Sequence, residues 1–106
     1  MNPIFANKTI ENTSGLSDAE VKQRLANGVE IKYRDFALVV EPGMIDQARM
    51  VMADEPNPVK MRLSIVRAIE RTIKRMLCDK ATVAERDNFA SDLCLLHALD
   101  ELYPKP

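Results

Sequence analysis

The positions of apolar residues divide the chain into helix-like and strand-like segments. Asn57 is a favourable N-cap and Pro58 suits the first position of a helix. After Pro58 the apolar residues recur every three or four positions, at Val59, Leu63, Val66, Ile69, Ile73 and Met76 or Leu77. This spacing predicts a long amphipathic helix over 58–80, with one face buried against the rest of the protein.

Between residues 29 and 40 the helical spacing gives way to alternation. Apolar residues lie at odd positions as far as Tyr33 and at even positions from Phe36 onward. A two-residue turn at Arg34 and Asp35 would bring all of them onto one face, so the pattern predicts a β-hairpin. The alternative is one strand bent by a bulge, because Arg-Asp is not a favoured hairpin turn.

Capping signals predict three further helix boundaries. Ser17 begins a capping box, which predicts a short helix that ends at Asn27-Gly28, where glycine tolerates the left-handed conformation. A second helix is expected from about Met44 to Asp54, because the prolines that follow disfavour its continuation. Thr82 begins another capping box and with it the last helix, which a short connection makes antiparallel to the central helix.

Together these segments predict an α+β, mainly α fold. It consists of a short N-terminal helix, a β-hairpin (or bent strand) at about 29–40, and three helices, of which the last two form an antiparallel helical hairpin. With 106 residues the chain is expected to form one domain, 1–106. Polar, turn-rich residues 1–15 are expected to form an irregular N-terminal arm. Two strands alone are marginal in water, so the hairpin must pack on helices or join strands of another chain.

The distribution of charge singles out the central helix. Residues 58–80 hold seven Lys or Arg and two Asp or Glu, a net charge of +5, whereas the whole chain carries −1. Like charges four residues apart repel each other, and Glu70 is placed to offset part of this repulsion through Lys74. The candidate residues for binding an anionic ligand or partner are the cations Lys60, Arg67, Arg71, Lys74 and Arg75. The alternative is that they meet the protein's own acidic last helix or an acidic subunit surface.

Signatures of catalysis, cofactors and metals are not found in the sequence. There is no glycine-rich phosphate loop, GxSxG motif or dinucleotide fingerprint. Cys94 and His97 are three residues apart and, with Asp100 and Cys78, offer a set of zinc ligands. Their spacing lacks the CxxC and HExxH patterns, and a buried cysteine beside a half-buried histidine is the commoner explanation. We therefore expect no metal, no cofactor and no enzymatic activity.

Composition limits the expected location and partners. No apolar run approaches the roughly 18–20 residues that cross a bilayer. The N-terminus lacks the pattern of a secretory signal, and two cysteines do not make a disulfide framework. We expect a cytoplasmic homo-oligomer without membrane contact. Its expected function is that of a small non-enzymatic interaction protein, an adaptor or inhibitor of the bacterial or phage accessory type, which binds a larger macromolecular partner. The alternative is binding of nucleic acid or a phosphorylated ligand through the basic helix 58–80.

Overall fold

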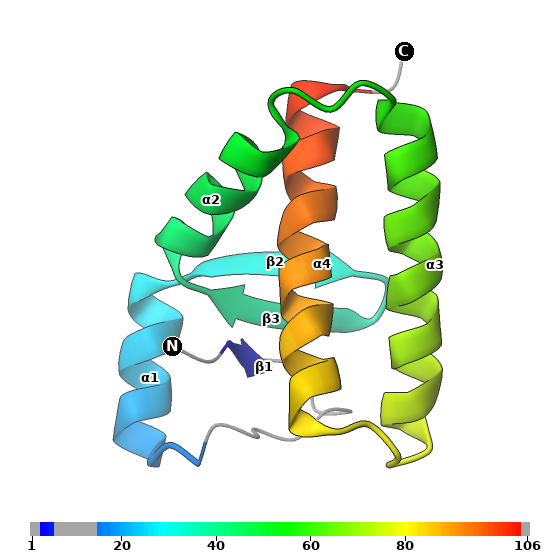
Figure 1. Ribbon diagram of the computed structural model, residues 1–106. Helices are drawn as coiled ribbons and strands as arrows, with labels where there is room; N and C mark the ends of the chain where they lie inside the picture. The colour runs from blue at the N-terminus through cyan, green and yellow to red at the C-terminus, as the bar shows by residue number, and fades with distance from the viewer. Residues whose placement is uncertain (1–2, 6–14, 105–106) are drawn as a thin grey trace.

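A computed structural model describes residues 3–5 and 15–104 of the chain. These residues form a mainly helical fold with a small antiparallel sheet. The elements are, in chain order, β1 (Ile4–Phe5), α1 (Asp18–Asn27), β2 (Val29–Tyr33), β3 (Phe36–Val40), α2 (Pro42–Met52), α3 (Pro58–Leu77) and α4 (Val83–Leu102). In Figure 1 α4 lies in the middle of a helical layer, between α2 and α3, and the sheet lies behind it.

The three strands are ordered β1-β3-β2, and both pairs are antiparallel. The hairpin between β2 and β3 has the predicted register, in which Tyr33 lies opposite Phe36 and Ile31 opposite Leu38. The turn between them is made by Arg34, at a φ of 54°, and Asp35. The predicted hairpin is therefore confirmed, and the alternative of one bent strand is wrong. The packing of apolar side chains on one face outweighs an unfavourable turn residue.

The core lies between the sheet and the helical layer. Phe89 of α4 is fully buried and connects the two, because it stacks on Phe5 of β1 and meets Phe36 of β3 edge-on. The ring centroids are 6.2 and 6.0 Å apart, within the range of favourable aromatic pairs. The long helices are capped as predicted: Asn57 accepts a hydrogen bond from the backbone N–H of Lys60, at 3.1 Å, and Thr82 begins α4 in the same way. Helix α2 begins at Pro42, slightly before the predicted start.

The N-terminal part differs from the prediction. The first helix has the bounds that the Ser17 capping box predicted, Asp18–Asn27, but it is not the N-terminal element, because the strand β1 precedes it. Within the expected irregular arm 1–15, Ile4 and Phe5 pair with β3. A strand of two residues is too short to produce a detectable alternation of apolar and polar residues, so β1 could not be predicted from this pattern. Residues 6–14 of the arm lie outside the described part.

Gly28 has a different role from the one that we expected. Its backbone is extended, at φ −92° and ψ 174°, so it does not use the left-handed conformation. A Cβ atom at this position would lie 2.1 Å from Cγ1 of Val39 and 3.0 Å from the carbonyl oxygen of Val40. Glycine is needed here because α1 ends directly against β3, and there is no space for a side chain.

Candidate functional site

The helix α3 presents the predicted site residues because its opposite side is anchored in the core. Ile65, Ile69 and Ile73 are buried, and they hold the helix along its inner face. Helix α4 runs alongside in the opposite direction (Figure 1), with Arg62 Nη2 lying 2.5 Å from Asp100 Oδ1 near one end of the pair. Burial of these isoleucines, rather than helix propensity, fixes which residues α3 displays outward.

Four of the five predicted residues lie on the exposed side of α3. We call Lys60, Arg67, Arg71 and Lys74 the basic row. Their side chains form no hydrogen bond or ion pair with the residues that the structure describes. The row extends over about 21 Å, at a rise of about 1.5 Å per residue. Arg67, Arg71 and Lys74 follow one another on consecutive turns, and Lys60 lies two turns before Arg67. Like charges on consecutive turns repel each other, and an external anion would neutralise them.

Arg75, the fifth predicted residue, belongs to a different environment. Its guanidinium forms a bidentate ion pair with Glu85 at the start of α4, and Nη2 lies 2.9 Å from Oε1. A hydrogen bond and the charge of Arg75 hold the pKa of the Glu85 carboxyl below its usual value. The expectation that the acidic last helix covers the basic helix therefore holds only at the margins of α3, where Arg62 and Arg75 meet α4.

Glu70 does not offset the basic row as we expected. Its Oε1 accepts a hydrogen bond from the Tyr33 hydroxyl at 2.6 Å and lies 2.6 Å from Arg34 Nη2. Both partners come from the hairpin, whose turn end lies against this side of α3. Burial raises the pKa of Tyr33, and its hydrogen bond to Glu70 raises it further. The carboxylate thus fastens the sheet to α3, and Lys74 has no ion pair with it.

Apolar side chains adjoin the basic row at the beginning of α3. Val59 and Leu63 have exposed fractions of 80% and 52%, which are high for large aliphatic side chains. Helical geometry places both between Val66 and the basic row around the circumference of α3, and we call the two residues the apolar margin. The exposed surface of α3 therefore combines positive charge with apolar area.

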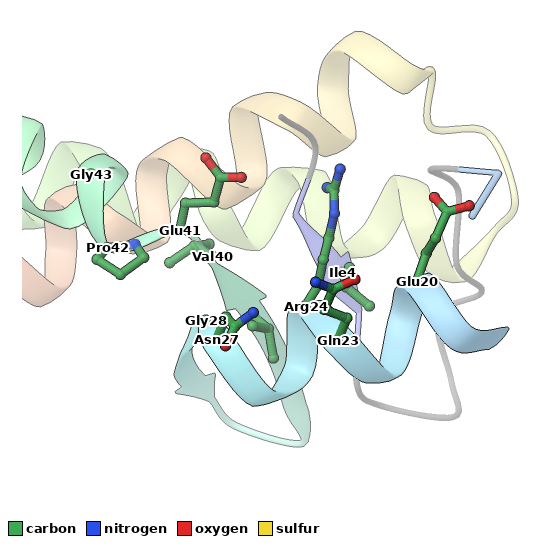
Figure 2. A pocket seen from close by; sticks show the side chains of 11 residues that line it. Ile4, Glu20, Gln23, Arg24, Asn27, Gly28, Val40, Glu41, Pro42 and Gly43 are labelled. Atoms are coloured by element: carbon green, nitrogen blue, oxygen red, sulfur yellow. The ribbon is translucent and has the colours of Figure 1, made fainter. Parts of the chain in front are cut away.

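Two cavities bring together residues that the sequence analysis did not connect. The first has a volume of about 580 Å³ and lies between α1 and the segment that joins β3 to α2. Figure 2 shows Glu20 and Arg24 extending from α1, while Glu41 comes from the start of α2. The Oε1 atom of Glu41 is buried and has no hydrogen-bond partner among residues 3–5 and 15–104. The second cavity, of about 510 Å³, lies beside β2 under α3 and α4. No local motif marks either cavity, because each is assembled from separate segments.

The cysteine and histidine residues of α4 have separate environments. Cys94 is buried in the core, and burial raises the pKa of its thiol to about 11, so the thiol stays protonated at neutral pH. His97 is half-exposed and its Nε2 lies 2.7 Å from Glu101 Oε1. Asp100 pairs with Arg62 instead of joining these groups. Among the described residues no three His, Cys, Asp or Glu side chains come together as metal ligands.

Comparison with known proteins does not add a function to this geometry. No model of a protein family, no curated protein and no solved structure matches the chain. None of the helices in residues 15–104 has the length and apolar character that crossing a membrane requires. The function is therefore argued from the surface of α3 and the sheet beside it.

Proposed function

We propose that this protein acts without catalysis, by binding a macromolecular partner, and that the partner is a protein with an acidic surface that docks on α3. The observation that carries the proposal is the basic row, whose charges lie close together on a rigid helix and have no partner among the described residues. Nearby guanidinium groups such as Arg62 and Arg75 do have carboxylate partners. An external acidic surface would supply the missing neutralisation.

The apolar margin supports a protein partner over a nucleic acid. Val59 and Leu63 expose aliphatic area directly beside Lys60 and Arg67. Phosphate groups give no favourable interaction with aliphatic surface, whereas protein interfaces combine an apolar centre with a charged rim. An acidic protein surface that carries apolar side chains at its centre matches both features of α3.

The test compares two variants with the same change in net charge. Arg67→Glu with Arg71→Glu reverses the middle of the basic row, and Lys22→Glu with Lys80→Glu reverses two exposed lysines elsewhere. We expect wild type and the second variant to capture the same protein from a native lysate, and the first variant to lose it. Circular dichroism should show the same helix content in all three proteins, since none of the four side chains is buried. Equal capture by both variants would refute the proposal.

Nucleic-acid binding is the second candidate, and the spacing of the basic row favours it. Four cations along one helix match the requirement for several phosphate contacts, and they would make binding steeply dependent on salt. If all four contact phosphates of duplex DNA, the logarithm of the association constant should fall with the logarithm of salt concentration with a slope of about −3.6. Fluorescence anisotropy with a labelled duplex and a labelled single strand measures this slope. A slope near that value, abolished by Arg67→Glu with Arg71→Glu, would replace the protein partner with nucleic acid.

A further inference from the structure

The strand β2 forms a free edge of the sheet. It is the last strand in the order β1-β3-β2, so only one of its sides is paired within the described chain. In a hairpin with a two-residue turn, the residues that flank the turn form a hydrogen-bonded pair, and such pairs then alternate along the strands. Tyr33, Ile31 and Val29 therefore bond to β3. The backbone N–H and C=O groups of Glu30 and Lys32 point away from β3, and they offer two donors and two acceptors to an additional strand.

The helical layer extends beyond this edge. Figure 1 shows that α3 and α4 continue past β2 toward the start of α3 and the end of α4, where no described strand lies behind them. We call this part of the helical layer the overhang. The cavity of about 510 Å³ occupies the corner between β2 and the overhang. The helix side chains that line it are Arg62 and Val66 of α3 and Leu93, Leu96, His97 and Asp100 of α4.

The underside of the overhang combines an apolar strip with the polar side chains Arg62, His97 and Asp100. Half-buried Val66 and Leu96 lie above buried Leu93 and form the surface on which a further strand would pack, and the apolar margin continues this surface toward the beginning of α3. Val59 and Leu63 are exposed because this part of α3 extends beyond the sheet, and helical spacing places both residues near Val66. The helices thus provide apolar area for a wider sheet than the described strands form.

We propose that the corner between β2 and the overhang accepts an extended segment of a partner protein, which adds to the sheet as a strand antiparallel to β2. The proposal rests on the proposed function, since the segment belongs to the protein that docks on α3. In this mode of recognition the main-chain hydrogen bonds supply affinity and the alternate side chains supply specificity. The segment buries its apolar side chains against the overhang and directs the others to the opposite face of the sheet.

The residues of β2 define the chemistry of the segment. Positions opposite Val29, Ile31 and Tyr33 face the helices and require apolar side chains. On the other face, an acidic side chain fits opposite Lys32 and a basic side chain opposite Glu30. Antiparallel addition brings the N-terminal end of the segment to α3. There, acidic residues would approach the basic row.

A second copy of this chain does not fit the corner, although its own β2 has the required pattern. The sequence of β2, VEIKY, alternates apolar, acidic, apolar, basic and apolar residues. Antiparallel pairing of two β2 strands requires a two-fold axis perpendicular to the sheet, which places both helical layers on the same face. The overhang already occupies the space that the second layer needs. A segment without a helical layer of its own meets no such obstruction.

The experiment uses the full chain labelled with ¹⁵N and the synthetic peptide acetyl-EEVEVKV-amide as the probe. Amide hydrogen exchange is measured residue by residue, with and without peptide. We expect exchange at Glu30 and Lys32 to slow by about tenfold or more at saturating peptide, because both amides gain a partner. The control peptide carries N-methyl groups on its central glutamate and its lysine, whose N–H groups face β2. It should bind at least about tenfold more weakly, since it lacks two hydrogen bonds.

Variants of Lys32 make the same test by removing a hydrogen-bond donor from the protein instead of from the peptide. Lys32→Pro removes an outward N–H group at an edge position that tolerates proline, while Lys32→Ala keeps this group. We expect the peptide to lose about tenfold in affinity for the proline variant relative to the alanine variant. If the proline variant does not fold, the comparison of the two peptides stands alone. Exchange that is unchanged by peptide, or equal binding of both peptides, overturns the proposal.

Two further measurements separate this proposal from its alternatives. Protection of Glu30 and Lys32 that rises with protein concentration in the absence of peptide, together with a dimer in sedimentation, would overturn it in favour of self-pairing. The variant Arg67→Glu with Arg71→Glu separates it from the proposed function. If that variant still captures the partner while the peptide protects β2, the docking role of the basic row fails and the strand site stands. If capture is lost and the peptide never protects β2, the strand site fails alone.

Discussion

The contact between Gly28 and β3 gives the sharpest test of how this fold is assembled. Replacing Gly28 with alanine adds one methyl group where α1 ends and β2 begins. That group would lie 2.1 Å from Val39 Cγ1, 2.9 Å from the carbonyl oxygen of Arg24 and 3.0 Å from that of Val40. Two of these three atoms belong to the backbone of regular elements, so they cannot move away without disturbing α1 or β3.

The expected cost follows from these distances. Overpacking of a buried site costs about 1–3 kcal/mol. Alanine also restricts the unfolded chain, which returns about 0.4–1 kcal/mol. Because three atoms crowd the new methyl group at once, we place the overpacking cost at the top of its range. We then expect a net loss of about 2 kcal/mol in the free energy of unfolding, which corresponds to about 8–16 °C in Tm for a domain of this size.

The assay is urea unfolding followed by circular dichroism, with Gly43→Ala as the matched control. A Cβ atom at Gly43 meets nothing within 4 Å, and the residue lies in the first turn of α2. The same substitution there should stabilise the protein by about 0.4–1 kcal/mol, because only the effect on the unfolded chain remains. The opposite signs of the two changes would show that packing at Gly28, and not the substitution itself, is responsible.

A double-mutant cycle with Val39→Ala identifies the clash. Removing Cγ1 of Val39 leaves the two carbonyl contacts in place but eliminates the shortest distance. Gly28→Ala should therefore cost at least about 1 kcal/mol less in the Val39→Ala background than in wild type. A loss below about 0.5 kcal/mol for Gly28→Ala alone, or equal costs in both backgrounds, would refute the packing argument.

Three further predictions concern the core, the thiols and the ion pairs. Phe89→Ala removes the ring that joins β1 and β3 to α4 and should lower the free energy of unfolding by about 3–5 kcal/mol in urea titrations; a loss below about 1 kcal/mol would contradict its place in the core. A thiol-specific reagent at pH 8 should label exposed Cys78 quickly and buried Cys94 only after unfolding, because burial raises the pKa of Cys94 to about 11. A hydrogen bond from Arg49 lowers the pKa of Glu101 from its usual 4.5, so this ion pair stabilises the protein above pH 4.5, and its contribution is lost as the pH falls through the lowered pKa. In the variant Arg49→Ala, the urea concentration at the unfolding midpoint should therefore fall less steeply with decreasing pH in this range than in wild type.

The sequence predicted the hairpin and the long helices because their signals are local. Side chains of a strand alternate between its two faces, so a slip of one residue would turn every apolar side chain outward. The apolar faces of β2 and β3 therefore determine the register of the hairpin. The caps at Asn57 and Thr82 depend on residues at most three positions away. Such features require no knowledge of the rest of the fold. The strand β1 could not be predicted, since its pairing with β3 connects residues far apart in the chain.

The candidate site was predicted in part, for related reasons. The basic row could be found because charge and helical spacing are both visible in the sequence. The partner of Glu70 could not, because Tyr33 and Arg34 reach it only after the hairpin has docked on α3. The free edge of β2 and the overhang depend on strand order and on the length of the helices relative to the width of the sheet. Both are properties of the tertiary structure.

The basic row and the free edge of β2 would be weak binding sites if they acted separately. Exposed charges are screened beyond about 8 Å at physiological salt, and a strand edge of five residues offers few hydrogen bonds. A partner that engages both sites would bind the second one intramolecularly, so the two affinities would reinforce each other. The ion pairs of Glu70 with Arg34 and of Arg62 with Asp100 fasten α3 to the hairpin and to α4. They hold the two sites in a fixed relation. This rigidity lowers the entropic cost of binding at both sites together.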